Sequence, residues 1–190
     1  GFFNRVDTPA VEGIVDMQYD IPNVSVDYVR VDTPIPVIFW RSVGNSHNAF
    51  TVESFMDELA HAAGKDPVEF RLQHLKHNPR AHHVVEVVAE KSGWGTPVPE
   101  GRARGIASHH SFGSYVAQVA EVSVDEQTGR IKVHRVVCAV DCGPTVNNDT
   151  VRAQMEGALT MGLSAALKER VKVADGGVRS ANFLDYPLLR

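Results

Sequence analysis

Hydrophobic positions recur at helical spacing in the first half of the chain. The first predicted helix has its apolar stripe at Val52, Phe55, Met56, Leu59 and Ala63. We expect Asn48 to cap this helix, because its side-chain oxygen can accept from an N–H group of the first turn, and Gly64 to end it. A second helix is predicted to open at Asp66 and Pro67, and a third covers residues 81–93.

In most of the remainder, apolar and polar residues alternate with the period of two that predicts strands. The predicted strands cover residues 24–32, 103–114, 115–124 and 130–141. The last two should form a hairpin around a turn at 125–129. One face of its second strand is expected to carry Ile131, Val133, Val137 and Ala139. A helix capped by Asp149 and running to about Lys168 follows, then extended pieces at 170–173 and 177–183.

This order of elements predicts an α+β fold, with a mixed sheet, a long β-hairpin and packed helices. Two segments are expected, 1–93 with the early helices and 94–190 with the hairpin and the last helix, although both can belong to a single domain. The chain lacks an initial Met, and it ends at Arg190 inside a predicted extended segment. Both ends therefore predict an internal piece of a longer protein.

Composition narrows the class of protein. Hydrophobic residues make up 43% of the 190 residues and charged residues 22%, which is ordinary for a globular protein. The net charge of −4 provides no basic surface, so we expect no nucleic acid partner. No apolar run approaches the roughly 20 residues that span a bilayer, so we expect no membrane span.

Cysteines and histidines give no metal or disulfide signature. In a strand, residues four apart such as Cys138 and Cys142 would lie about 13 Å apart, which is too far for a disulfide, so both are expected to be small buried hydrophobes. None of the nine histidines shows a zinc spacing such as H-E-x-x-H, so a histidine–metal hydrolase is the weakest hypothesis.

Two junctions between a loop and a helix are candidate ligand sites. The loop at residues 41–48 combines Gly, Ser and Asn with Arg41, so it offers backbone N–H groups and a forked cation to an anion. An ordinary capped helix explains the same residues. In the helix at 149–162, small residues surround Gln154, which we expect to be partly buried. The alternative there is a helix packed tightly on a sheet.

Both junctions carry a family resemblance. The string VIFWRSVGNSHNAFTVESFMDELAHAAGKDPVEFRLQHLK (37–76) resembles the molybdenum-binding large subunit of the xanthine dehydrogenase and aldehyde oxidase family. The string AQVAEVSVDEQTGRIKVHRVVCAVDCGPTVNNDTVRAQMEGALTMGLSAAL (117–167) resembles the hairpin and Q-x-E-G helix of that family. The residues of these motifs are most similar to those of the β subunits of isoquinoline 1-oxidoreductases.

The resemblance implies a molybdopterin-binding domain and an oxidoreductase that hydroxylates N-heterocycles or oxidises aldehydes with oxygen from water. The implied cofactor is molybdenum held by molybdopterin cytosine dinucleotide, with iron–sulfur clusters on a partner subunit. Arg41 matches the arginine beside the molybdenum, and Val43 matches a wall of the substrate pocket. Arg152, Ala153 and Gln154 match the segment that binds the pterin.

The chain also departs from the family pattern. Neither the upstream glycine-rich loop nor the downstream Gly-Glu segment with the general base is present, so no catalytic residue is expected here. The isolated chain is therefore expected to be inactive. The alternative is a non-catalytic binding or assembly domain that reuses the fold.

Overall fold

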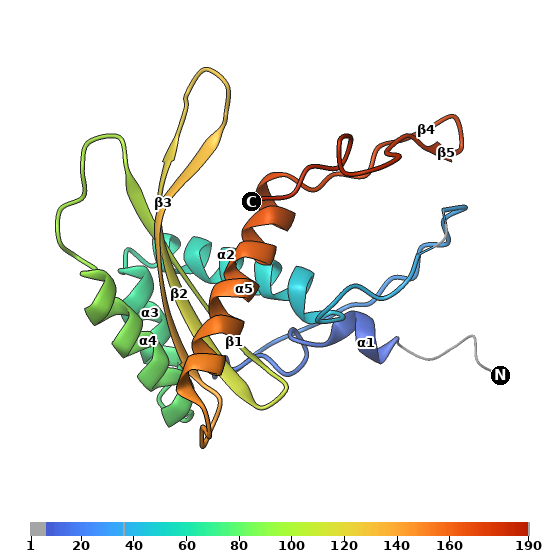
Figure 1. Cartoon of the computed structure of the whole chain (residues 1–190). Helices are drawn as coiled ribbons and strands as arrows, with labels where there is room; N and C mark the ends of the chain where they lie inside the picture. Colours follow the sequence, from blue (N-terminus) through green and yellow to red (C-terminus); the bar gives the residue numbers. More distant parts are fainter. Residues whose placement is uncertain (1–6, 36, 190) are drawn as a thin grey trace. The chain divides into compact units, whose positions relative to one another are not determined.

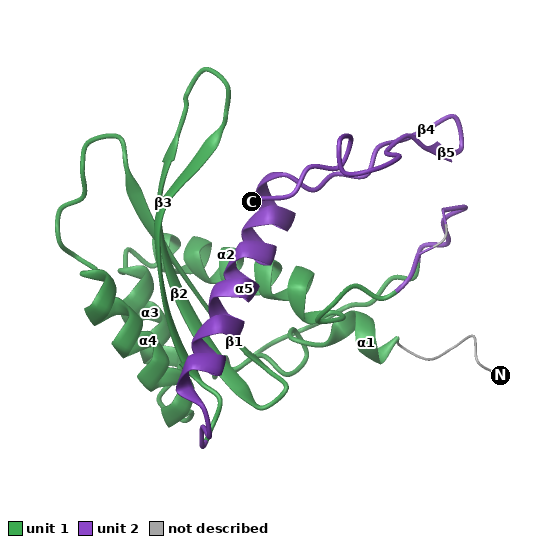
Figure 2. Ribbon diagram, viewed as in Figure 1, with its two compact units in different colours: residues 1–30, 39–143 green, residues 31–38, 144–190 purple. Residues whose placement is uncertain are grey.

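The structure is a computed structural model that describes residues 7–35 and 37–189. It divides into two compact units (Figure 2): unit 1 comprises residues 1–30 and 39–143, and unit 2 comprises 31–38 and 144–190. The division into 1–93 and 94–190 stays a prediction.

Unit 1 is built on a three-stranded antiparallel sheet (Figure 1). Its strands are β1 (Ala103–Ser111), β2 (Ser114–Val124) and β3 (Ile131–Asp141), in the order β1-β2-β3. The α+β class and the hairpin are confirmed. Every strand pairing in the described residues is antiparallel, so the expected mixed sheet is not seen there. Tight connections between successive strands are the physical reason, since parallel neighbours need a long crossover.

A β-bulge changes the face that part of β3 presents. Glu121 pairs with Arg135 but Val122 pairs with Val133, so His134 is an extra residue in β3. One extra residue moves the side chains before it to the other face of the sheet. Ile131 and Val133 therefore do not share a face with Val137 and Ala139, and that expectation was wrong.

Helices cover one face of the sheet. The helices of unit 1 are α1 (Thr8–Val11), α2 (Asn45–Ala62), α3 (Pro67–His74) and α4 (Pro79–Ser92). In Figure 1, α4 lies against β2 and β3, with α3 beside it. The buried core joins these elements through Met56, Leu75, Val85, Val88 and Val119. All three predicted helices are confirmed.

The ends of α3 and α4 follow from local chemistry. Asp66 Oδ1 accepts from the N–H groups of Val68 and Glu69 at 2.8 and 3.1 Å, which satisfies donors of the first turn of α3. Asn78 caps α4, which begins at Pro79, two residues before the predicted start at residue 81. Gly93 ends α4 in the left-handed conformation that glycine adopts without a steric penalty.

A buried ionic cluster ties α2 to α3 and β1. Arg71 is fully buried, and its Nε donates to Glu53 Oε2 at 2.9 Å. The Glu53 carboxylate also accepts from Tyr19 Oη at 2.7 Å and from the Ser108 N–H group at 2.8 Å. Burial raises the pKa of the Glu53 carboxyl, and the Arg71 guanidinium opposes that rise. Each buried charge thus has hydrogen-bonded partners, as burial requires.

The same cluster corrects the predicted stripe of α2. Phe55 is 58% exposed, whereas Glu53 is 6% exposed. The buried side of the helix carries Asn45, Asn48, Val52, Glu53, Met56 and Ala60. The buried side of α2 is therefore rotated about the helix axis from the predicted apolar stripe, because paired polar side chains form part of the buried side.

Unit 2 consists mainly of one long helix. α5 runs from Asn148 to Leu167 and is followed by the short strands β4 (Val173–Ala174) and β5 (Gly177–Val178). The helix is confirmed, but Asn147, not Asp149, caps it: Asn147 Oδ1 accepts from the Thr150 N–H group at 2.9 Å. The C-terminal segment contacts the helix through the Leu189 N–H group, which donates to Ser164 Oγ at 3.1 Å.

The strand predicted at residues 24–32 does not form. No strand is assigned to this stretch, and Val29 and Val31 are each 78% exposed. Alternation alone does not make a strand, because the backbone groups also need a neighbouring strand.

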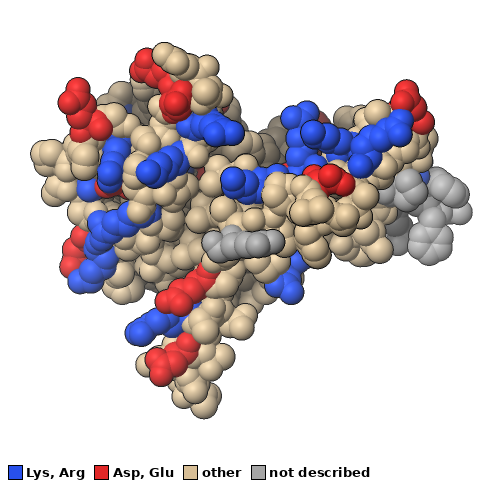
Figure 3. All heavy atoms as spheres, turned by 45° about the horizontal axis from the view of Figure 1, so that its top comes forward, with Lys and Arg blue, Asp and Glu red and all other residues tan. Residues whose placement is uncertain are grey.

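The surface in view carries both signs of charge. Figure 3 shows basic and acidic side chains interspersed over the visible face. Among the helices of the described residues, none is long and apolar enough to cross a bilayer.

Candidate functional site

The first candidate, the Arg41 loop, ends in a tight turn before α2. The Val43 N–H group donates to Trp40 O at 3.0 Å, and the Asn45 N–H group donates to Ser42 O at 3.0 Å. Ser42 and Val43 have φ angles of +77° and +54°. A β-branched residue in this left-handed region is a genuine outlier, of the kind that gathers at functional sites.

Asn48 does not cap α2, contrary to the prediction. Gly44 holds the N-cap position, and no side chain caps the helix there. Asn48 lies inside the first turn, and its amide nitrogen donates to Ala10 O at 2.9 Å and to Glu12 O at 2.8 Å. The missing side-chain cap leaves the start of α2 suited to an external acceptor, since the first N–H groups of a helix have no intrahelical partner.

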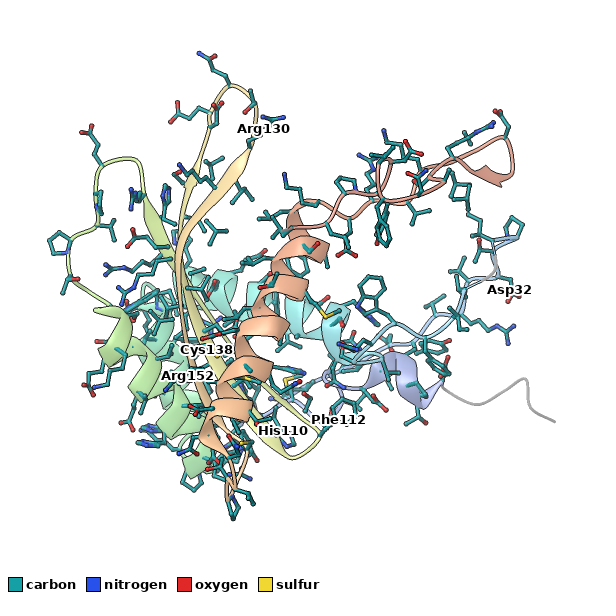
Figure 4. All side chains as sticks on the ribbon, in the orientation of Figure 1. Asp32, His110, Phe112, Arg130, Cys138 and Arg152 are labelled. Atoms are coloured by element: carbon teal, nitrogen blue, oxygen red, sulfur yellow. The ribbon has the colours of Figure 1, made fainter. Side chains whose placement is uncertain are left out.

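The second candidate lies on α5. Arg152, Ala153 and Gln154 are all exposed, so the expected partial burial of Gln154 was wrong. The stripe at Val151, Met155 and Leu159 is half-buried, and these three residues lie one helical turn apart. Gln154 falls outside that stripe. Figure 4 shows the side chain of Arg152 on α5.

Small residues make one side of α5 accessible. A Cβ atom added at Gly157 would have no other atom within 4 Å. Arg152 and Gln154 thus provide donors next to a stretch of exposed backbone. A planar, polar ligand can approach such a surface closely.

The two cysteines differ in their exposure to solvent. Cys138 is half-buried on β3, and burial raises the pKa of its thiol. Cys142 is exposed, so the expectation of a buried hydrophobe was wrong for this residue. In the described part of the chain, no group of three or more His, Cys, Asp or Glu side chains could hold a metal ion.

A half-buried ion pair holds the end of β3. Arg80 donates to Asp141 through Nε at 2.9 Å and through Nη2 at 2.8 Å, and the Arg80 guanidinium also lies 4.6 Å from the centre of the Tyr115 ring. The Gly143 N–H group donates to Asp141 Oδ1 at 2.9 Å. The hydrogen bond from Arg80 holds the pKa of the Asp141 carboxyl well below its usual range.

Two residues that sequence reasoning missed belong to the first candidate. Asn45 is 7% exposed and contacts His109 on β1. Gly44 lies so close to the backbone of Pro9 that a Cβ atom would come within 2.2 Å of the Pro9 carbonyl oxygen. For Asn45, its helical spacing relative to Asn48 and Val52 was the available signal, because it places both amides on the buried side.

The donors at both candidates fit a molybdopterin cofactor. Pterins and phosphates present many acceptors, and both candidates offer donors: Arg41 with the start of α2 in unit 1, and Arg152 with Gln154 in unit 2. The open space at Gly157 also suits a large planar group. The Arg41 loop adds a fixed geometry, which a specific ligand requires.

Comparison with protein families shows which family this chain belongs to. Two family models, both described as molybdopterin cofactor-binding domains, match residues 47–190 and 5–75. The chain belongs to this family. The resemblance seen in the sequence is thereby confirmed, and so is the assignment of a molybdenum cofactor.

Individual relatives agree with the family. The chain is 41% identical to the beta subunit of isoquinoline 1-oxidoreductase of Brevundimonas diminuta, over 90% of the chain and 22% of that protein. It is 38% identical to a nicotinate dehydrogenase subunit of Pseudomonas putida, over 89% of the chain and 16% of that protein. It is 33% identical to the membrane-bound aldehyde dehydrogenase (pyrroloquinoline-quinone) of Gluconacetobacter polyoxogenes, over 79% of the chain and 22% of that protein. The chain thus spans at most 22% of the length of these relatives.

Proposed function

We propose that this chain is the cofactor-binding segment of the large subunit of a molybdenum hydroxylase. The reaction is the hydroxylation of an N-heterocycle or the oxidation of an aldehyde, with oxygen from water. The 41% identity to an isoquinoline 1-oxidoreductase subunit over 90% of the chain carries the proposal. The name of the nicotinate dehydrogenase relative supports an N-heterocyclic substrate.

Each candidate residue has a separate role in this proposal. Arg41 donates to the cofactor near the metal, and Val43 forms part of the wall of the substrate pocket. Arg152, Ala153 and Gln154 bind the pterin, with Gln154 as donor and acceptor and Ala153 allowing close approach. An aliphatic Val43 contacts the substrate without the ring stacking that an aromatic residue would give.

The cofactor in this proposal is molybdopterin cytosine dinucleotide. When bound, the molybdenum centre supplies the two-electron oxidation. Iron–sulfur clusters on a partner subunit would accept the electrons. No residue of this chain matches the general base of the family, so the chain binds and orients while a glutamate elsewhere in the subunit acts as base.

A second candidate is a non-catalytic binding or assembly domain. The same missing glutamate favours it, since a module without a base can bind the cofactor and not turn over substrate. The pyrroloquinoline-quinone in the name of one relative adds a further cofactor to be tested.

The test is cofactor analysis of the complete subunit, purified with its partner. We expect about one molybdenum per subunit, cytidine monophosphate after hydrolysis of the cofactor, and iron in the partner. Arg41→Ala and Gln154→Ala should each lower molybdenum occupancy. Arg130→Ala and Gln127→Ala are the matched controls, because both side chains lie in the exposed β2–β3 turn (Figure 4 labels Arg130).

Two results would contradict the proposal. A quinone cofactor in place of molybdenum would move the chain to another cofactor class. Molybdenum without any turnover of N-heterocycles or aldehydes would favour the non-catalytic domain. The 190-residue chain alone should retain no stoichiometric molybdenum after gel filtration.

A further inference from the structure

The turn that carries Arg41 is held in an unfavourable backbone conformation. Two successive non-glycine residues, Ser42 and Val43, have positive φ angles. Such residues persist only where surrounding contacts determine them. The contacts that hold this turn are therefore part of how the loop works.

One anchor is the segment at residues 9–12. Asn48 Nδ2 donates to Ala10 O at 2.9 Å and to Glu12 O at 2.8 Å. Asn48 is only 9% exposed, so these bonds are largely shielded from water. Gly44 lies against the same segment, where a Cβ atom would come within 2.2 Å of Pro9 O. The start of α2 is thus held to this segment by the hydrogen bonds of the Asn48 amide. It can pack closely there because Gly44 has no Cβ atom.

A second anchor runs from β1 through Asn45. His109 Nε2 lies 2.9 Å from Asn45 Oδ1, and Asn45 Nδ2 donates to Glu12 Oε2 at 3.4 Å. Because an amide oxygen only accepts, His109 Nε2 carries a proton. Burial lowers the pKa of His109, Asp16 opposes this, and His110 adds to it. The neutral imidazole therefore acts as the donor.

We propose that Asn45 and Asn48 are positioning residues for the cofactor. They hold the turn at residues 41–43 against the segment 9–12 and against β1, and so fix where Arg41 meets its ligand. This role rests on the proposed function, because Arg41 is the group that contacts the cofactor. Without the anchors the turn relaxes, and only a fraction of molecules presents Arg41 correctly.

The main test is Asn48→Asp in the complete subunit. Aspartate has nearly the same shape, but its carboxylate cannot donate and would face two carbonyl oxygens. Hydrogen exchange at the Val43 and Asn45 N–H groups should accelerate about tenfold, since two hydrogen bonds are lost. The apparent dissociation constant for the molybdenum cofactor should rise by a similar factor. Exchange in β2 and β3 should stay unchanged.

A second test moves the negative charge from Glu12 to position 45, so that the role of Asn45 does not depend on a single variant. Asn45→Asp places a carboxylate beside Glu12, and the like charges should loosen the turn. Adding Glu12→Gln removes one charge and restores a donor, so the double variant should recover both exchange protection and cofactor affinity. Thr51→Ala is the control, because Thr51 lies one turn further along α2, is exposed, and donates within its own helix, to His47 O at 3.0 Å.

The outcomes separate the claims. Faster exchange with unchanged cofactor affinity would overturn the positioning role and leave a purely structural anchor. Unchanged exchange in both variants would overturn the anchor itself. A wild-type subunit that binds no molybdenum cofactor would overturn the proposed function and the positioning role with it, whatever the exchange data show.

Discussion

Units 1 and 2 hold their candidate cofactor residues in opposite ways. In unit 1, the Arg41 loop is followed by a helix whose buried side carries paired polar residues, and Asn45, Asn48 and Glu53 are each less than 10% exposed. In unit 2, the only buried residue of α5 is Ser164, and Arg152 and Gln154 are exposed. Backbone geometry is therefore determined by long-range contacts in one unit and by the helix itself in the other.

The difference shows how two donors with similar chemistry can depend on different parts of a chain. Arg41 lies beside a turn with positive φ angles, so its place depends on distant residues such as Ala10 and His109. Gln154 lies in a regular helix, whose geometry needs only its own hydrogen bonds. Substitutions remote in sequence should therefore disturb the first donor and leave the second unaffected.

The largest effect should come from the ionic cluster under α2. Glu53→Ala leaves the fully buried Arg71 with only its bond to Asp57, at 2.6 Å, as an ionic contact. Breaking a buried pair from one side costs about 3–5 kcal/mol. Urea unfolding followed by circular dichroism should show this loss. Glu58→Ala, on the exposed side of the same helix, should change stability by less than about 0.5 kcal/mol.

Two glycines compare the units directly. Gly44→Ala should destabilise unit 1 by about 1–3 kcal/mol, because the new methyl group meets the backbone of Pro9. The φ angle of Gly44 is −70°, so alanine has no conformational penalty there and the loss measures the contact. Gly157→Ala should instead stabilise α5 by roughly 0.5–1 kcal/mol. Equal changes in the free energy of unfolding at Gly44 and Gly157 would contradict the proposed difference between the two units.

The ion pair at the end of β3 makes unit 1 sensitive to acid. The Asp141 carboxyl has a depressed pKa in the folded state, so its stabilising contribution is present above its unfolded pKa of about 4 and is lost as pH falls toward the folded value. Asp141→Asn should therefore lower the urea midpoint at pH 7, and the difference from wild type should shrink below about pH 4. A difference that stays constant down to pH 2 would contradict this.

Sequence reasoning succeeded where structure is local. The helix capped by Asp66 and the turn ending at Gly129 depend on caps and spacing within a few residues. The last helix was also predicted, although Asn147 caps it and not Asp149. Sequence reasoning failed where a distant partner decides. The segment 24–32 alternates like a strand but does not form one, and the extra residue His134 reverses the face of β3.

The features of the candidate site also separate into local ones, which the sequence predicted, and long-range ones, which it did not. Local sequence placed Arg41 and Gln154 at loop–helix junctions and the family resemblance gave them their expected roles, but the anchors of the Arg41 loop were not predicted. Asn48 was assigned to a cap because local sequence favours that role, whereas its true acceptors are Ala10 O and Glu12 O. Contacts between residues more than 30 positions apart cannot be inferred from local spacing.

The smallest expected effect on stability is at Gln154. Because its side chain is exposed and lies in a regular helix, Gln154→Ala should change the free energy of unfolding by less than about 0.5 kcal/mol. The same variant should lower cofactor occupancy in the complete subunit, since a donor and an acceptor are removed together. Thr160→Ala on the same helix is a suitable control, because Thr160 is exposed and donates to Glu156 O at 3.0 Å within the helix. A Gln154 variant that unfolds more easily would show that α5 depends on contacts of this side chain, and its geometry would then be no more self-determined than that of the Arg41 loop.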